Sequence, residues 1–242
     1  MSDSEKLDNL YKLARRARDN GSSDEANKYY RQILMKAPDC WESVFYSAYF
    51  LAVQKHKNGN TVDALTTLRN CIGDVFSCIN NTIENIDKRN DAVTDVVAAS
   101  TQMCLAYLDR CRESYKVNKL SIEQVEALSF EFARRAYVVS QIWASLGDEI
   151  IRFFGNDDSL CKEAVSLWQK IEKDINYAVL NKFIDYSQGS AIEKMYDEKI
   201  KQYVEIIGKN DQSYYWKHTG KCQYDGGKLG FFGKCKSCGR KS

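Results

Sequence analysis

The residues best suited to chemistry are three cysteines near the C-terminal end, Cys222, Cys235 and Cys238. Cys235 and Cys238 are separated by two residues and are followed by Gly239. At this spacing two thiolates can bind one metal ion, while the glycine relieves the tight turn between them. The pattern predicts one structural Zn²⁺ per chain, held by the three thiolates and a fourth ligand.

The segment from about residue 217 to 240 resembles a short zinc ribbon, in which two C-x2-C pairs bind one ion. Cys235-Lys-Ser-Cys238 matches one pair, and Cys222-Gln-Tyr-Asp225 stands in place of the other, with Asp225 where the second cysteine would be. In such a ribbon, residues 229–233 would form the turn and the apolar side of a small hairpin.

Two residues could complete a tetrahedral site. Asp225 occupies the position in the motif and would supply a carboxylate oxygen. His218, four residues before Cys222, would make a Cys3His set, which suits the borderline softness of zinc better, so we favour His218. The alternative to both is a decayed motif that binds no metal.

This C-terminal segment differs in composition from the rest of the chain. Six of the 13 glycines lie between Gly220 and Gly239, and residues 217–242 carry a net charge of +6. So short a segment cannot bury enough apolar surface to fold without a staple, which a bound metal would provide. We therefore expect residues 210–242 to form a separate basic, zinc-ribbon-like unit.

The same segment carries a candidate nucleic-acid surface. Aromatic rings that stack on bases, beside cations that meet phosphates, are typical of such surfaces. Here the rings would be Tyr214, Tyr215 and Trp216, and the cations would be Lys221, Lys228, Lys234, Lys236 and Arg240. Alternatively, the three rings pin the tail to the preceding helix.

No catalytic arrangement stands out in the sequence. His56 and His218 are the only histidines, and no Gly-x4-Gly-Lys-Ser/Thr motif is present. Three thiolates with a fourth protein ligand would make a closed, structural site. These features predict a protein that is not an enzyme.

The rest of the chain must position these residues, and its composition favours helices. Hydrophobic residues make up 44% of 242 residues, the formal net charge is only +2, and there is a single proline. Apolar residues recur at the helical period throughout, with no period-2 run. We expect an all-α fold of antiparallel helical hairpins, arranged as a solenoid or a bundle.

Residues 7–75 resemble tetratricopeptide repeats. The first copy has a turn at Gly21, a stop at Pro38 and the packing positions Leu10, Leu13, Ala14, Ala17, Ala26, Tyr30 and Ile33. A looser second copy begins at Cys40, with Val44, Ala48 and Leu51 on its first helix and Ala64, Leu68 and Cys71 on its second. Its connection, residues 54–60, is longer, as if the first helix gained about one turn. The resemblance implies a groove that binds another protein or a peptide.

Further long helices are expected over residues 91–115, 121–154, 159–186 and 192–207, with breaks or caps at Gly147, Gly155, Gly189 and Gly208. They would form a second region, residues 76–209, packed on repeats in residues 1–75. Whether they continue the solenoid or form a separate bundle is open.

Residues 1–20 contain no apolar core of a signal peptide, and no stretch is apolar enough to span a membrane. We expect a cytoplasmic protein with reduced thiols and no membrane partner. The function that fits is a non-enzymatic scaffold or adaptor, and the alternative is a factor that contacts RNA or DNA through its basic tail.

Overall fold

The computed structural model describes residues 2–115, 120–230 and 233–241. Within these ranges the chain forms nine helices and isolated β-bridges but no extended strand, so the prediction of an all-α fold is confirmed. The helices are α1 Asp3–Asp19, α2 Ser23–Lys36, α3 Trp41–Lys57, α4 Thr61–Thr82, α5 Ile86–Tyr115, α6 Ile122–Phe154, α7 Asp158–Leu180, α8 Tyr186–Gly208 and α9 Gln212–His218.

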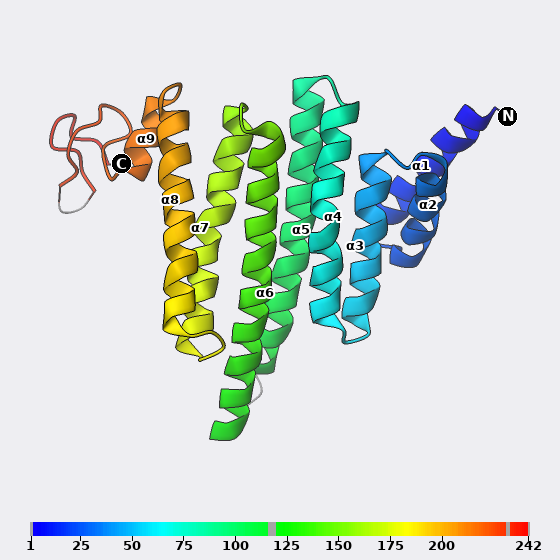
Figure 1. The fold of residues 1–242 in the computed structure, drawn as a ribbon, viewed down its shortest axis with the longest axis horizontal. Coiled ribbons are helices and arrows are strands. Elements are labelled where there is room, and N and C mark those ends of the chain that lie inside the picture. Colours follow the sequence, from blue (N-terminus) through cyan, green and yellow to red (C-terminus); the bar gives the residue numbers. More distant parts are fainter. Residues whose placement is uncertain (1, 116–119, 231–232, 242) are drawn as a thin grey trace.

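The helices stand side by side in an elongated row that runs from α1 and α2 at one end to α8 and α9 at the other (Figure 1). Each helix packs against the next one in the chain, and α4 also packs directly against α6. A continuous cluster of buried side chains extends from Ala14 to Ile207. None of the described helices is both long and apolar enough to cross a bilayer.

The first helical pair buries the face that the sequence predicts. Ala14 and Ala17 of α1 meet Ala26, Tyr30 and Ile33 of α2, and all five are buried. The turn between the helices contains Gly21 with a φ of 72°, a left-handed conformation that suits glycine. Leu13, also expected to pack, is instead exposed.

The second pair differs from its prediction in the face that α3 buries. Val44 and Ala48 are only partly buried and Leu51 is exposed, whereas Phe45, Tyr46 and Phe50 form the buried face. Aromatic rings remove more apolar surface from water than the smaller side chains do, and the rings of Tyr46 and Phe50 also stack on Tyr30 of α2. α3 continues to Lys57 and has 17 residues, the same length as α1.

On α4, Ala64 and Leu68 are buried as expected and Cys71 is partly buried. α4 continues without a break through residues 75 and 76, between which the expected boundary of the first two regions falls.

The later helices lie near the expected ranges, but α5 begins at Ile86 rather than at residue 91, and the boundaries around residue 181 also differ. The segment expected as one helix over 159–186 ends at Leu180, and α8 begins at Tyr186. Lys182 adopts a left-handed conformation, and Asp185 caps α8 by accepting a hydrogen bond of 2.8 Å from the Gln188 N–H.

Gly147 and Gly189, expected as helix breaks, lie inside α6 and α8. A Cβ at Gly147 would come within 2.4 Å of Trp168 Nε1, and one at Gly189 within 2.3 Å of Val179 Cγ2. These glycines therefore let neighbouring helices approach closely. The other two expectations hold, since Gly155 caps α6 and Gly208 ends α8.

Candidate metal centre

The short helix α9 joins the C-terminal segment to the helical row. Asp211 caps α9 by accepting from the Tyr214 N–H, and its carboxylate also pairs with Lys162 of α7 at 2.8 Å. Tyr215 lies against the end of α8, where a Cβ at Gly208 would be 2.7 Å from Tyr215 Cβ. Contacts with α7 and α8 thus hold α9 in place.

Beyond α9, four side chains converge: Cys222, Asp225, Cys235 and Cys238. Their potential ligand atoms all lie within 4.8 Å of one another. Cys222 Sγ is 3.6 Å from Cys238 Sγ, and Cys235 Sγ is 3.3 Å from Asp225 Oδ1. Cys222 and Cys235 are buried, whereas Asp225 and Cys238 face solvent. Among the described residues, this is the group that could hold a metal ion.

The second half of the site is a tight turn that begins at Cys235. The Gly239 N–H donates to the Cys235 carbonyl at 3.0 Å, and the Cys235 N–H donates to the Arg240 carbonyl at 2.7 Å. Gly239 has a φ of 73°, a conformation that glycine adopts without strain. The turn brings the side chain of Cys238 to the same side of the backbone as that of Cys235.

The first half repeats this turn. The Gly226 N–H donates to the Cys222 carbonyl at 2.8 Å, the Cys222 N–H donates to the Gly227 carbonyl at 2.9 Å, and Gly226 has a φ of 69°. The two turns therefore have the same pattern of backbone hydrogen bonds, and each has a left-handed glycine at the equivalent position. Asp225 stands in the first turn where Cys238 stands in the second.

Backbone N–H groups support the charged forms of these ligands. The Cys238 and Ser237 N–H groups donate to Cys235 Sγ and lower the pKa of that thiol. The Gly227 N–H, 3.0 Å from Asp225 Oδ1, lowers the pKa of that carboxyl. Burial has the opposite effect on Cys222, whose pKa it raises to about 11.

His218, which the sequence analysis favours as fourth ligand, does not join this group; its alternative, Asp225, does. His218 is the last residue of α9, and its Nδ1 lies 2.9 Å from the Tyr214 carbonyl one turn earlier. Its ring also packs on the Tyr214 ring, with centroids 4.1 Å apart. The helix thus directs His218 back along α9.

The three aromatic residues proposed for base stacking are half-buried and pack within the protein. Tyr214 and Tyr215 contact the core cluster. Trp216 covers the first turn of the site, where a Cβ at Gly226 would come within 2.7 Å of the indole. This agrees with the alternative interpretation, in which the rings pin the tail to the helices.

The cations of the tail point to solvent. Lys221, Lys228, Lys234, Lys236 and Arg240 are all exposed. Isolated bridges link Lys221 to Lys228, Leu229 to Cys235 and Lys234 to Lys241, so the backbone between the two turns is paired. Phe231 and Phe232 of the expected hairpin lie outside the described residues.

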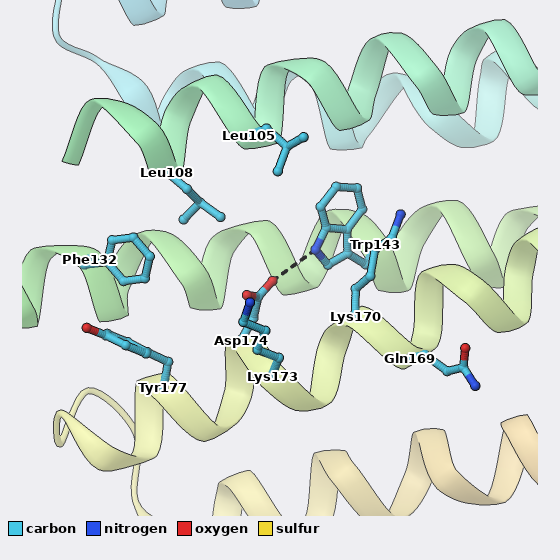
Figure 2. Close-up of a pocket in the computed structure, with 9 residues that line it drawn as sticks. All are labelled: Leu105, Leu108, Phe132, Trp143, Gln169, Lys170, Lys173, Asp174 and Tyr177. Carbon is cyan, nitrogen blue, oxygen red and sulfur yellow. Dashed lines mark hydrogen bonds between the residues drawn. The ribbon is translucent and has the colours of Figure 1, made fainter. Parts of the chain in front are cut away.

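A second feature, which the sequence analysis did not find, is a hollow of about 580 Å³ between α5, α6 and α7. Figure 2 shows Leu105 and Leu108 of α5 facing it from one side, Phe132 and Trp143 of α6 along its floor, and Tyr177 of α7 opposite. Gln169, Lys170, Lys173 and Asp174 complete the lining.

Trp143 is held in place by the polar residues of this hollow. Its Nε1–H donates to Asp174 at 3.0 Å, and the Lys170 ammonium lies 4.9 Å from the ring centroid. Trp143 and Asp174 are 31 residues apart, so no local spacing in the sequence could have revealed the pair.

Comparison of the chain with protein-family models, curated proteins and solved structures finds no significant match. Function therefore has to be argued from the chain's own residues.

Proposed function

We propose that the C-terminal unit binds one structural Zn²⁺ through Cys222, Asp225, Cys235 and Cys238. The convergence of four ligand atoms supports this proposal. Three thiolates and one carboxylate are donors that zinc accepts, and four protein ligands complete its tetrahedral preference. A filled coordination sphere leaves no position for substrate, so the ion has a structural role.

The repeated turn is the specific reason to assign Asp225 as the fourth ligand. In both turns the second ligand follows the first at the same spacing and precedes a left-handed glycine. The N–H groups that surround Cys235 Sγ would also stabilise a metal-bound thiolate.

Substitution of Co²⁺ tests the coordination. We expect tetrahedral d–d bands and thiolate-to-cobalt charge-transfer bands, both of which disappear when Zn²⁺ displaces Co²⁺. An octahedral spectrum without charge transfer would contradict the assignment.

We further propose that the helical row is a non-enzymatic scaffold that binds another protein through the hollow between α5, α6 and α7. The observation that supports this function is the open apolar lining: Leu105 is 46% exposed and Tyr177 36% exposed, although both are large and largely apolar. Apolar surface of this kind in a hollow is typical of binding sites.

A photo-crosslinking amino acid at position 105 tests this function in cells. We expect it to capture one predominant protein that also binds the purified chain, with the binding abolished by Leu105→Lys. The matched control is the same amino acid at Met35, an exposed apolar position on α2. Equal capture from both positions, or binding that Leu105→Lys does not change, would rule out the hollow as the interface.

A second candidate function is contact with RNA or DNA through the tail, which the exposed cations favour. Tyr214, Tyr215 and Trp216 pack internally, so among the described residues of the tail the ring available for stacking is Tyr224, which is exposed and lies under the Arg240 guanidinium at 5.0 Å.

A fluorescent single-stranded RNA tests this function. We expect binding that weakens steeply with salt and that is reduced by Lys228→Ala with Lys236→Ala, but not by Lys201→Ala on α8. Absent or salt-independent binding would exclude it.

A further inference from the structure

We propose that the hollow between α5, α6 and α7 receives an acidic amphipathic helix of the partner protein. This inference rests on the proposed function and specifies the partner's chemistry. It follows from the shape of the site, the chemistry of its lining and the charge at its rim.

The shape favours a helix. α5 and α7 both pack against α6, but no comparable contact joins α5 to α7 within the described ranges. The two helices form opposite walls of a trough whose floor is α6 (Figure 2). An amphipathic helix lying in a groove of this kind buries its apolar face against the floor and both walls.

The lining is built to receive apolar side chains. Phe132 and Trp143 of the floor and Leu108 of the α5 wall are nearly buried, whereas Leu105 and Tyr177 of the two walls are partly exposed. The edge of the Phe132 ring meets Tyr177, with centroids 4.7 Å apart. The volume of about 580 Å³ falls in the range of sites that enclose a ligand group.

The charge at the rim selects an anionic partner. Lys170, Lys173, Asp174 and Tyr177 follow at helical spacing on one face of α7. The Asp174 carboxylate is engaged by the Trp143 indole. Within the described part of the chain, neither Lys170 nor Lys173 forms an ion pair with a carboxylate. Glutamates flanking the apolar face of a bound helix would supply the missing partners.

Two synthetic helices provide the probe. Each has about 16 residues, or roughly four turns, with leucines on one face, and they differ only in whether Glu or Lys flanks that face. Binding is followed by the indole N–H signals of the four tryptophans in a ¹⁵N-labelled protein. The Trp143 signal is assigned with Trp143→Phe.

We expect the acidic helix to shift the Trp143 signal and to bind at least about tenfold more tightly than the basic helix. The double variant Lys170→Glu, Lys173→Glu should reverse this preference. Lys201→Glu, an exposed change of the same charge on α8, should leave it intact. Circular dichroism establishes that each variant is folded.

Equal binding of both helices, or a preference that the double variant does not change, would contradict the inference that the partner helix is acidic. Neither result would contradict the scaffold function. If neither helix shifts the Trp143 signal but decanoate does, the site takes a small apolar acid and the inference fails. Crosslinking at position 105 then decides the scaffold function independently.

Discussion

At the scale of single residues, the two aspartates of the C-terminal segment have different tasks. Asp225 accepts a backbone N–H and approaches three thiols. Asp211 caps α9 and pairs with Lys162 of α7. One aspartate therefore belongs to the metal site, while the other holds the helix that carries it.

The pH dependence of stability tests the role of Asp211. Hydrogen bonds from Lys162, Ser213 and the Tyr214 N–H lower the pKa of this carboxyl well below its usual range. A lowered folded-state pKa gives stability that is complete above the unfolded pKa, near 4, and is lost as pH falls through the folded value.

Asp211→Asn keeps a capping side chain but removes the charge. We expect the variant to unfold at a lower temperature than the native chain above about pH 4, and the gap to close toward lower pH. Thermal unfolding across pH measures this difference. A gap that is constant with pH would contradict the role of the charge.

Gly147 of α6 packs closely against Trp168 of α7. The Trp168 indole that a Cβ would strike is fully buried and donates to Asp148 at 3.0 Å, so it cannot move aside freely. We expect Gly147→Ala to lower the free energy of unfolding by about 1–3 kcal/mol.

Urea denaturation measures this change, and Gly73→Ala is the matched control. Gly73 lies inside α4, and the nearest atom to an added Cβ there, in Glu149, is 3.6 Å away. The control should raise stability by about 0.5–1 kcal/mol, because alanine favours a helix interior. Equal destabilisation by both changes would show that the contact with Trp168 is not the cause.

At the scale of elements, a buried carboxylate joins the first three helices. Glu42 of α3 is only 5% exposed. It accepts hydrogen bonds from the Arg15 guanidinium of α1 at 2.6 and 3.0 Å and from the Tyr30 hydroxyl of α2 at 2.8 Å. The Glu42 carboxylate therefore links α1 to α3 by a polar contact, beside the packing of both helices on α2.

Glu42→Ala would leave the buried Tyr30 hydroxyl without its acceptor and would remove the carboxylate that pairs with the partly exposed Arg15 guanidinium. We expect a loss of about 2 kcal/mol in the free energy of unfolding, measured by urea denaturation. Lys6→Ala, which removes only the exposed pair with Asp3, should change stability by less than about 0.5 kcal/mol. A loss for Glu42→Ala as small as that of the control would contradict the joining role.

Helix existence was predictable from the sequence, because apolar periodicity and caps act locally. Ser121 shows this, since its capping box with Gln124 starts α6 where the sequence indicated. The end of α7 was not predictable, because Asn181 to Asp185 contain apolar residues that continue the period. Gly189 was wrongly expected to break a helix. The reason for a glycine there is the close contact with Val179, which depends on the fold.

The metal site was predictable in its three cysteines, which the sequence places at ligand spacing. The fourth ligand required the fold. Donor preference favoured His218, but α9 continues to that residue and turns its ring onto Tyr214. The lining of the hollow comes from α5, α6 and α7, so its assembly depends on tertiary packing.

At the scale of the whole molecule, the helical row and the C-terminal unit depend on different forces. The row has its own continuous apolar cluster. In the C-terminal unit, the buried residues after α9 are Cys222 and Cys235, so apolar burial contributes little there within the described residues. The metal would supply the missing stability.

Removal of the metal should therefore loosen only the end of the chain. With EDTA, we expect faster hydrogen exchange and proteolysis at residues 221–241, while exchange in α3, α4, α6 and α7 stays slow. Hydrogen exchange read by mass spectrometry measures both regions at once. Equal loosening of α6 would mean that the row depends on the metal, and no change at residues 221–241 would mean that the unit does not.

The most direct test of the central claim is the zinc content of the purified chain and of three variants, measured by elemental analysis. We predict one zinc per chain for the native protein and for His218→Ala. Cys235→Ser should lose the ion, and Asp225→Ala should bind it at least about tenfold more weakly, as expected when a ligand is removed. Loss of zinc from His218→Ala with full retention in Asp225→Ala, or no zinc in the native protein, would contradict the site described above.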